Sequence, residues 1–440
     1  MQHIEKTTRQ GARVILIDTG ATLTPEAQAM VLAMYSRSNK SVLEHLNVVA
    51  KKGAEGFMAT YYVGYGHQSI GELGDVTVCL EGISMLAAKA FQDWMKYRGQ
   101  ESSTRYIDFG SQPFLNPLND LERNVYLESL RNFYVYALPV QEAFLTAKYP
   151  IMEDADDKAL GIYQKAVKAR AFDVLRGFLP AGATTNVAWH IDLREAADQL
   201  RELRHHVLEE IRDLADVVEQ VLLEKYPSSF GHKKYEQTEA YIGECAGYSS
   251  PERREHAVTI EHDGIDRGFL ARLPKKLLAV PTKTPLSRKV RPAGVLRFSM
   301  TLDFASYRDI QRQRSVNQNM PLLTTELGFE EWYMDELAPK LKDQAQKLID
   351  GAPTGGDAID QYYLPMGFKL FFEACGDLSA LHYIVQLRAQ KTVHPTLASR
   401  TKRLGEMLQG RFGERGLPFY FDFDPTGFSV KRGEQDIIKR

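Results

Sequence analysis

The 440-residue sequence contains only three cysteines, Cys79, Cys245 and Cys375. They lie far apart and none belongs to a CxxC pair or a Cys/His spacing, so the sequence indicates neither a disulfide framework nor a zinc site. It also lacks a basic segment followed by an apolar stretch at its start, and no run reaches the roughly eighteen apolar residues of a membrane span. We therefore expect a cytoplasmic protein with no membrane partner and no bound metal.

A strong excess of charge of either sign is also missing. The 55 basic and 57 acidic residues leave a formal net charge of −2, so no bulk nucleic-acid binding is expected and a small anionic ligand needs a local group of arginines. Single hydrophobic cores stop growing near about 250 residues, so a chain of this length predicts two domains.

The two halves of the sequence repeat one order of elements. Leu179–Pro180 is followed, twelve residues after the proline, by Asp192–Leu193, and Leu364–Pro365 is followed at the same interval by Asp377–Leu378. In both halves an alternating strand pattern runs directly into a helical pattern, in the first half near Gly82. Internal duplication explains this order most simply.

The predicted fold class is α+β, with two tandem units that each pack a small sheet against long helices and pair as a pseudo-dimer. We place the first repeat at 1–230, a linker at 231–255 and the second repeat at 256–440. Apolar periodicity predicts helices at about 119–149, 155–177, 192–226, 328–350 and 358–374.

A first polar cluster, GHQSIGE, places His67, Ser69 and Glu72 in a turn before a predicted strand. Loops beside strands often carry ligand groups. These side chains can equally serve only to satisfy backbone groups of the turn.

A second cluster, QESSTRY, follows the helix that is predicted to end near Tyr97. Hydroxyls, backbone N–H groups and a guanidinium in one short stretch suit a phosphate, because each phosphate oxygen needs a donor and arginine can bind two of them. Taken alone, a capped polar loop is the alternative interpretation.

A third cluster, SYRDIQRQR, places Arg308 and Arg312 one helical turn apart, with Arg314 pointing elsewhere on an ideal helix. The three converge only if the helix ends there. An exposed basic helix end that complements the helix dipole is the simpler interpretation.

In this order the clusters resemble the flavin-dependent thymidylate synthase family (ThyX). GHQSIGELGDVTVCLEGIS is similar to the family's GHxSxxEH, strand and Gly-Ile-Ser run, and QESSTRY is similar to its closing Asn-Glu-x-Ser-x-Arg-Tyr. The resemblance implies FAD-mediated reductive methylation of dUMP, or a related pyrimidine nucleotide, to dTMP, with methylenetetrahydrofolate and NADPH as co-substrates. The flavin carries the hydride, so the resemblance implies no catalytic side chain.

The resemblance also assigns site residues. Those expected to bind the nucleotide are Gln100, Glu101, Ser102, Ser103, Arg105, Arg176, Asp309, Arg312 and Arg388. Those expected to bind the cofactor are His67, Ser69, Arg194, Arg312, Gln313 and Arg314.

Each repeat departs from the family pattern in a different place. The family's Arg-His-Arg signature falls on Asp93, Trp94 and Met95 in the first repeat, whereas the second repeat keeps Arg312 and Arg314 but has NQNMPLLTT in place of the Ser/Arg loop. Because family sites form between subunits, we expect one composite site between the repeats and an inactive mirror site. A homodimer would then stand in for the family's tetramer.

The alternative function is a non-catalytic relative that binds a nucleotide, or a nucleotide on RNA, without flavin. Gln313 in place of the signature histidine and Asp309 in place of the family's glutamine favour this alternative. A purely structural role explains the duplicated helices but leaves QESSTRY and RQRS without a purpose.

Overall fold

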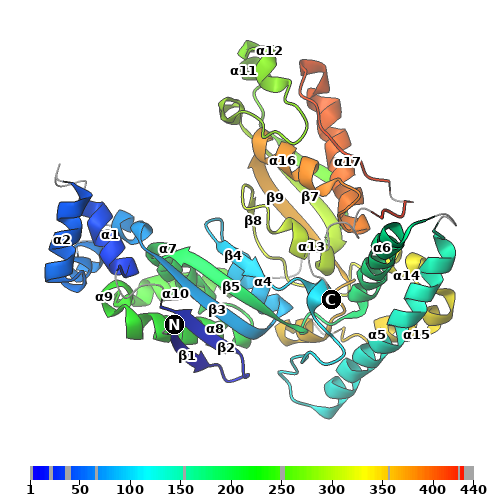
Figure 1. The fold of residues 1–440 in the computed structure, drawn as a ribbon, viewed down its shortest axis with the longest axis horizontal. Helices are drawn as coiled ribbons and strands as arrows, with labels where there is room; N and C mark the ends of the chain where they lie inside the picture. The colour runs from blue at the N-terminus through cyan, green and yellow to red at the C-terminus, as the bar shows by residue number, and fades with distance from the viewer. Residues whose placement is uncertain are drawn as a thin grey trace. The chain divides into compact units, whose positions relative to one another are not determined.

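The computed structural model describes residues 3–18, 23–34, 41–64, 68–151, 155–247, 253–354, 357–424 and 427–430. The chain divides into two compact units, shown in Figure 1. Unit 1 comprises Met1–Tyr106 and Thr184–Ser250, and unit 2 comprises Ile107–Ala183 and Pro251–Arg440. Residues 107–183 therefore belong to the first predicted repeat in sequence but to unit 2 in space.

Unit 1 is built on a five-stranded antiparallel sheet of order β1-β2-β3-β5-β4. Its strands are β1 His3–Thr7, β2 Arg13–Ile17, β3 Asp75–Ser84, β4 Arg98–Glu101 and β5 Thr184–Asp192. Its longer helices are α1 Pro25–Ala33, α2 Val42–Lys52, α4 Met85–Gln92, α7 Leu193–Leu203, α8 Glu209–Lys225 and α10 Glu236–Gly247. Its short helices are α3 Glu55–Phe57, η2 Met58–Gly64, η3 Gln68–Leu73, η4 Thr104–Tyr106 and α9 Pro227–Phe230.

The strand-to-helix join of unit 1 lies where the sequence predicts it. Gly82 has a φ of 72°, and the pairing of β3 with β5 shifts register between Glu81 and Ile83, which makes a β-bulge. The Ser84 hydroxyl then accepts a hydrogen bond from Ala87 N–H and caps α4. The bulge and the cap together turn the chain from the sheet into the helix.

Unit 2 contains a four-stranded antiparallel sheet of order β6-β7-β9-β8. Its strands are β6 Thr259–Asp263, β7 Val295–Asp303, β8 Asn317–Gln318 and β9 Lys369–Asp377. Its longer helices are α5 Leu121–Lys148, α6 Asp157–Leu175, α13 Phe304–Ile310, α15 Lys342–Asp350, α16 Leu378–Arg388 and α17 Pro395–Phe412. Its short helices are η5 Arg176–Phe178, α11 Arg267–Arg272, α12 Lys275–Leu278, η6 Arg288–Ala293, α14 Glu331–Glu336, η7 Pro339–Leu341, η8 Ala358–Tyr363 and η9 Gly413–Arg415.

The two sheets have matching cores. The order β2-β3-β5-β4 in unit 1 corresponds to β6-β7-β9-β8 in unit 2. Strands β5 and β9 are each 9 residues long, and each runs directly into a helix of 11 residues, α7 or α16. An aspartate caps both helices, Asp192 in unit 1 and Asp377 in unit 2.

The two Leu-Pro segments pair with each other inside unit 2, through an antiparallel bridge between Pro180 and Pro365. The backbone hydrogen bonds are reciprocal: Ala181 N–H to Leu364 O at 2.8 Å, Met366 N–H to Leu179 O at 2.8 Å, Gly182 N–H to Tyr362 O at 2.8 Å, and Gly367 N–H to Gly177 O at 2.7 Å. Equivalent positions of the two repeats thus exchange donor and acceptor roles.

Three sequence-based element predictions were wrong. The helix expected over 192–226 is two helices, because the chain turns at 204–208, where Leu208 N–H donates to His206 Nδ1. The helix expected over 358–374 is a 3-10 helix followed by β9, whose side chains are almost all buried or half-buried and so lack polar alternation. The helix expected over 328–350 is α14, the 3-10 helix η7 and α15, because the chain is extended at Leu337. The segment 231–255, predicted as the linker, contains α10. In the described residues, no helix is both long enough and apolar enough to cross a bilayer.

Candidate functional site

Unit 2 gathers four arginines around one aspartate at the end of its sheet where α13 begins (Figure 1). Asp309 and Arg308 lie in α13, and Arg312 follows directly after that helix ends at Ile310. Arg176 caps the end of α6 and Arg388 is the last residue of α16. The ends of α6, α13 and α16 therefore carry arginines of this cluster. Three of these arginines, Arg176, Arg312 and Arg388, are among the residues that the family resemblance assigns to the nucleotide.

Asp309 is the counter-charge of this cluster. Its carboxylate lies 3.8 Å from Arg176 Nη2, and 30% of its side chain remains exposed. Burial by itself raises the pKa of Asp309, but Arg176, Arg312, Arg388 and Arg308 together hold it at about 2, against an ordinary value of 3.8. Asp309 is therefore ionised at neutral pH.

Arg388 is oriented by Gln313, the residue at the position of the family's signature histidine. With its amide oxygen turned toward Arg388, Gln313 accepts hydrogen bonds from Nη2 at 3.0 Å and Nε at 3.1 Å. Burial and the neighbouring Arg312 lower the pKa of Arg388, whereas Asp309 opposes that change. Gln313 and Arg388, predicted for cofactor and nucleotide respectively, are in direct contact.

Arg176 is almost fully buried, with 5% of its surface exposed. Its Nε and Nη2 atoms make no hydrogen bond within the described part of the chain. Burial opposes its charge, but Tyr333, Asp309, Asp173 and Asp303 outweigh that effect and raise the pKa of Arg176. A buried guanidinium with two unused donors fits an incoming oxyanion, because buried donors normally have a partner.

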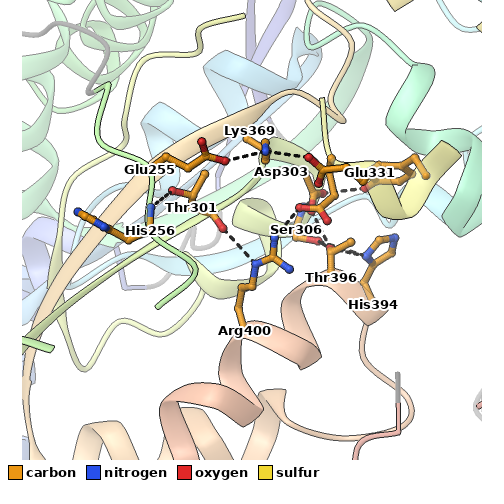
Figure 2. A network of polar contacts seen from close by, with 12 residues as sticks. Glu255, His256, Thr301, Asp303, Ser306, Glu331, Lys369, His394, Thr396 and Arg400 are labelled. Atoms are coloured by element: carbon orange, nitrogen blue, oxygen red, sulfur yellow. Dashed lines mark hydrogen bonds and ion pairs between the residues drawn. The ribbon is translucent and has the colours of Figure 1, made fainter. Parts of the chain in front are cut away.

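A buried polar network holds Tyr333 beside Arg176. Tyr333 OH donates to Asp303 Oδ2 at 2.7 Å, and Asp303 Oδ1 accepts from Thr396 Oγ1 at 2.6 Å. Figure 2 shows Thr396 and His394 meeting Asp303 from the start of α17, with His394 Nδ1 2.8 Å from Thr396 Oγ1. Burial, and next Asp303, raise the pKa of Tyr333 well above its ordinary range, so the phenol stays neutral. The network therefore fixes one wall of the arginine cluster.

Sequence analysis did not find Tyr333 or Asp303. The one local signal is Gly177, directly after Arg176, where an added Cβ would lie 2.6 Å from the Tyr333 ring. Only glycine permits that approach, but a single glycine in a sequence does not reveal which side chain packs on it.

Glu330, next to this network, yields a test of the electrostatics. It is 4% exposed and accepts a hydrogen bond from Arg400 Nη2 at 2.8 Å. Burial raises the pKa of Glu330 to about 7 despite Arg400, with Asp303 and Glu331 adding to the increase. Because the folded state holds this proton more tightly than the unfolded chain does, stability falls as the pH rises from about 4.5 to about 7.

We expect Glu330→Gln, which mimics the protonated acid, to be more stable than the wild type at pH 8 by up to about 3 kcal/mol. At pH 4.5 the two should unfold at nearly the same temperature. Thermal unfolding at both pH values measures the difference. The neighbouring exposed Glu331→Gln is the control and should change little. A less stable Glu330→Gln at pH 8 would show that the ionised Glu330–Arg400 pair is favourable.

Asp309 predicts the opposite pH dependence. Its folded-state pKa lies below the ordinary 3.8, so the ionised carboxylate stabilises the fold above that pH, and the contribution disappears as the pH falls toward about 2. We expect Asp309→Asn to lower the free energy of unfolding by roughly 2 kcal/mol at pH 7 and by little at pH 2. Urea unfolding of both proteins across this range measures the difference. A difference that does not vary with pH would contradict the assignment.

In unit 1 the segment after α4 corresponds to the segment after α13 in unit 2. Its side chains belong to a network of hydrogen bonds and ion pairs. Trp94 Nε1 donates to Glu195 Oε2 at 2.7 Å, and Lys96 Nζ also bonds Glu195. Glu72 accepts from Arg194 Nη1 at 2.6 Å, and Asp198 lies 3.5 Å from Arg194 Nε. Arg194, predicted for the cofactor, therefore already has two carboxylates beside it.

The QESSTRY segment divides between the sheet and the surface. Gln100 and Glu101 end β4, and Glu101 forms a buried ion pair with Lys89 at 2.6 Å. Ser102 N–H donates to Asn186 O at 2.9 Å, whereas the side chains of Ser103 and Arg105 are exposed. The exposed pair, Ser103 and Arg105, is available to a ligand.

The remaining predicted residues lie on the surface or outside the described residues. Ser69 is exposed in η3, and Arg312 and Arg314 are exposed after α13. His67 lies outside the described residues. Because Arg105 belongs to unit 1 and Arg312 to unit 2, the expectation that they share one site stays a prediction.

Comparison with known families identifies the family that residues 19–228 resemble. Residues 19–228 match the family model Thy1, "Thymidylate synthase complementing protein". The chain contains a thymidylate synthase complementing protein domain. The family resemblance drawn from GHQSIGE and QESSTRY is thereby confirmed, since both segments lie inside the matched residues.

Relatives of this Thy1-containing chain extend over most of its length. It is 26% identical over 397 residues to a UPF0159 protein of Chlamydia muridarum, covering 75% of this chain and 74% of the relative. A UPF0159 protein of Chlamydia pneumoniae is 25% identical, with 75% and 73% covered. UPF0159 protein Ta1429 of Thermoplasma acidophilum is 21% identical over 459 residues, with 86% and 90% covered.

The described residues contain no group of three or more His, Cys, Asp or Glu side chains arranged to hold a metal ion. The predicted site residues offer arginines, hydroxyls and backbone donors. These groups suit phosphates, which both a nucleotide and FAD carry.

Proposed function

We propose that this protein is a flavin-dependent thymidylate synthase-like enzyme of the cytoplasm that binds dUMP, or a related pyrimidine nucleotide, at the Arg176–Asp309 cluster. The observation that carries the proposal is the buried Arg176 guanidinium, whose Nε and Nη2 lack hydrogen-bond partners in the described residues. Arg312 and Arg388, on neighbouring helix ends, supply further positive charge. A nucleotide dianion needs such a set, because a buried charge is costly unless it is paired.

The duplication and the pseudo-dimer are part of this proposal. Three observations support them: the shared strand order, the equal lengths of β5–α7 and β9–α16, and the reciprocal hydrogen bonds between the two Leu-Pro segments. Reciprocal bonds between equivalent positions are what a two-fold axis produces. We accordingly propose that the two repeats pair as two family subunits would, and that two chains form a homodimer.

In the proposed enzyme, Ser103 and Arg105 of the QESSTRY segment bind the same ligand as the Arg176–Asp309 cluster, in one composite site. The mirror site is inactive, because Trp94 and Lys96 bond Glu195 where the signature arginines would stand. His67, Ser69, Arg194, Arg312, Gln313 and Arg314 remain the proposed flavin contacts. Bound FAD would supply the hydride for methylation from methylenetetrahydrofolate and be reduced again by NADPH, while the protein orients nucleotide and flavin.

The visible absorption spectrum tests flavin binding. We expect purified protein, or protein mixed with FAD and desalted, to retain a flavin spectrum. We also expect the gene to support growth of a thymidine-requiring host. Protein that retains no flavin and fails in that host is not this enzyme.

The second candidate is a nucleotide-binding protein without redox chemistry. The observation that favours it is the bidentate contact of Gln313 with Arg388, which gives the signature position a structural partner. Calorimetry with dUMP separates the two candidates. The non-catalytic binder takes up dUMP in flavin-free protein with the same affinity as in FAD-loaded protein, whereas a composite flavin site shows tighter binding with FAD present.

A further inference from the structure

The segment 267–294 of unit 2 forms a lobe with positive charge only. It contains eight basic residues and no acidic residue, although at the chain's average of 57 acidic residues in 440 about four would be expected. The structure describes every residue of the lobe, which consists of α11, α12, η6 and the loops between them, with both short helices packed against η6. We call this segment the basic lobe.

Six of the eight cations have no ion-pair partner in the part of the chain that the structure describes. Arg267 pairs with Asp263, and Arg291 lies 3.5 Å from Asp377. The exposed cations without such a partner are Arg272, Lys275, Lys276, Lys283, Arg288 and Lys289. Like charges on one short segment repel one another, so a lobe with six uncompensated cations favours an anionic partner.

The corresponding part of unit 1 carries no such charge. The 3-10 helix directly before β3, Gln68–Leu73, contains Glu72 and no basic residue, whereas the one directly before β7, Arg288–Ala293, contains three. The lobe is therefore a property of the second repeat and not of the shared fold.

The basic lobe is separate from the Arg176–Asp309 cluster. Helix η6 immediately precedes β7 and α13 immediately follows it, so the two lie at opposite ends of that strand, about 25–30 Å apart at the usual rise per residue. Figure 1 likewise places α11 and α12 at the far end of unit 2 from α13. A ligand of the arginine cluster does not account for the lobe.

The chemistry of the lobe selects among anionic partners. Its large apolar side chains are buried, as Leu270, Leu278 and Val290 are, or half-buried, and none of them is exposed. Helices of 6 and 4 residues with no apolar outer face do not insert into a bilayer. A protein partner usually contributes to an apolar interface core, which this surface does not offer.

A single small phosphate also fits poorly, because a specific site needs convergent and partly buried donors. Dispersed, exposed lysines and arginines instead match a polymer that repeats its charge along its length. We propose that the basic lobe binds the phosphate backbone of a nucleic acid, without reading its bases. The net charge of the chain is near zero although the basic lobe is positive, because acidic residues elsewhere balance the charge of the lobe.

The test is fluorescence anisotropy of the full-length protein with a labelled 20-nucleotide RNA of mixed sequence and with its duplex DNA counterpart. If about four phosphates of single-stranded RNA are contacted, raising the salt from 50 to 200 mM weakens binding by about 50-fold. The variant Lys275→Gln/Lys276→Gln/Lys283→Gln/Lys289→Gln should lose at least about tenfold in affinity at 50 mM salt and show a shallower salt dependence.

The matched control is Lys51→Gln/Lys52→Gln/Lys158→Gln/Lys165→Gln, which removes the same charge from exposed lysines elsewhere. It should keep most of the wild-type affinity, and the thermal midpoints of both variants should match the wild type. Equal losses in the two variants, or no RNA or DNA binding by the wild type, would overturn the proposal.

Competitors identify the partner class and keep this proposal apart from the proposed function. Excess dUMP should leave RNA bound, because the two surfaces are separate, and displacement by dUMP would place the RNA at the arginine cluster and refute the lobe. Phosphatidylserine vesicles and poly-glutamate are the other probes. Tighter binding of either than of the oligonucleotides would overturn the assignment to nucleic acid.

Discussion

Replacing Glu101 by glutamine is expected to lower the stability of unit 1 by about 3–5 kcal/mol, because it leaves Lys89 charged and buried without its counter-ion. The side chains of Lys89 and Glu101 are 0% and 1% exposed, and Nζ and Oε2 are 2.6 Å apart. Gln92 also donates to Glu101 at 3.1 Å. Chemical denaturation of the variant and the wild type measures the change.

Two controls separate the buried pair from general charge effects. Glu224→Gln removes the carboxylate of a surface ion pair with Lys6. Because the Glu224 side chain is 54% exposed, this variant should change stability by less than about 1 kcal/mol. The double variant Lys89→Met/Glu101→Leu removes both charges and should recover much of the lost stability. A Glu101→Gln protein as stable as the wild type would mean that Lys89 loses its proton readily or reaches water.

The Glu101→Gln variant also tests whether Glu101 of the QESSTRY segment touches the nucleotide. The resemblance assigns Glu101 to nucleotide binding, while the structure gives its carboxylate a partner inside the sheet. If Glu101 acts only by holding β4, the folded variant at low temperature should bind dUMP with nearly wild-type affinity. If it touches the nucleotide, affinity falls even where the protein is fully folded.

Removing Arg312 is expected to weaken dUMP binding by about 10- to 100-fold, since a hydrogen bond to a charged group contributes roughly 1.5–3 kcal/mol. Arg312 is exposed and lies beyond the end of α13, so Arg312→Ala should fold normally. Isothermal titration calorimetry with dUMP measures the affinity. Arg403→Ala, which removes a 63%-exposed arginine from α17, is the matched control and should bind as the wild type does.

Asp309→Asn should raise the affinity for dUMP in the same calorimetry, whereas Arg312→Ala lowers it. Removing the Asp309 carboxylate raises the positive charge around the four arginines, so dUMP should bind more tightly while the free protein loses stability. Arg312→Lys keeps the charge but loses the planar fork, and should fall between wild type and Arg312→Ala. Unchanged dUMP affinity in all three variants would remove the cluster from the proposed site.

The sequence predicted several local features well. The Gly82 join and the two Asp-Leu helix starts lie where their residues indicate, because capping and φ preference act over a few residues. It failed at 369–377, where a strand buried on both faces has no polar alternation and so resembles a helix.

The candidate site was predicted in part. Arg176, Arg312 and Arg388 were assigned together only through the family resemblance, and the structure brings all three near Asp309. The roles of Tyr333 and Asp303 could not be predicted from the sequence, since they reach Arg176 from elements distant in the chain and Gly177 alone does not reveal its neighbour.

The sequence by itself carried the Thy1 resemblance of residues 19–228, the predicted repeat of elements and the residue types available for an anion. Only the tertiary structure decided which charges are already compensated. Glu101 and Arg194 have partners, the Arg176 guanidinium keeps unused donors, and the basic lobe keeps unpaired cations. The physical reason is that burial and pairing depend on neighbours brought together by folding, and the same arginine in sequence becomes a structural ion pair or a ligand site according to them.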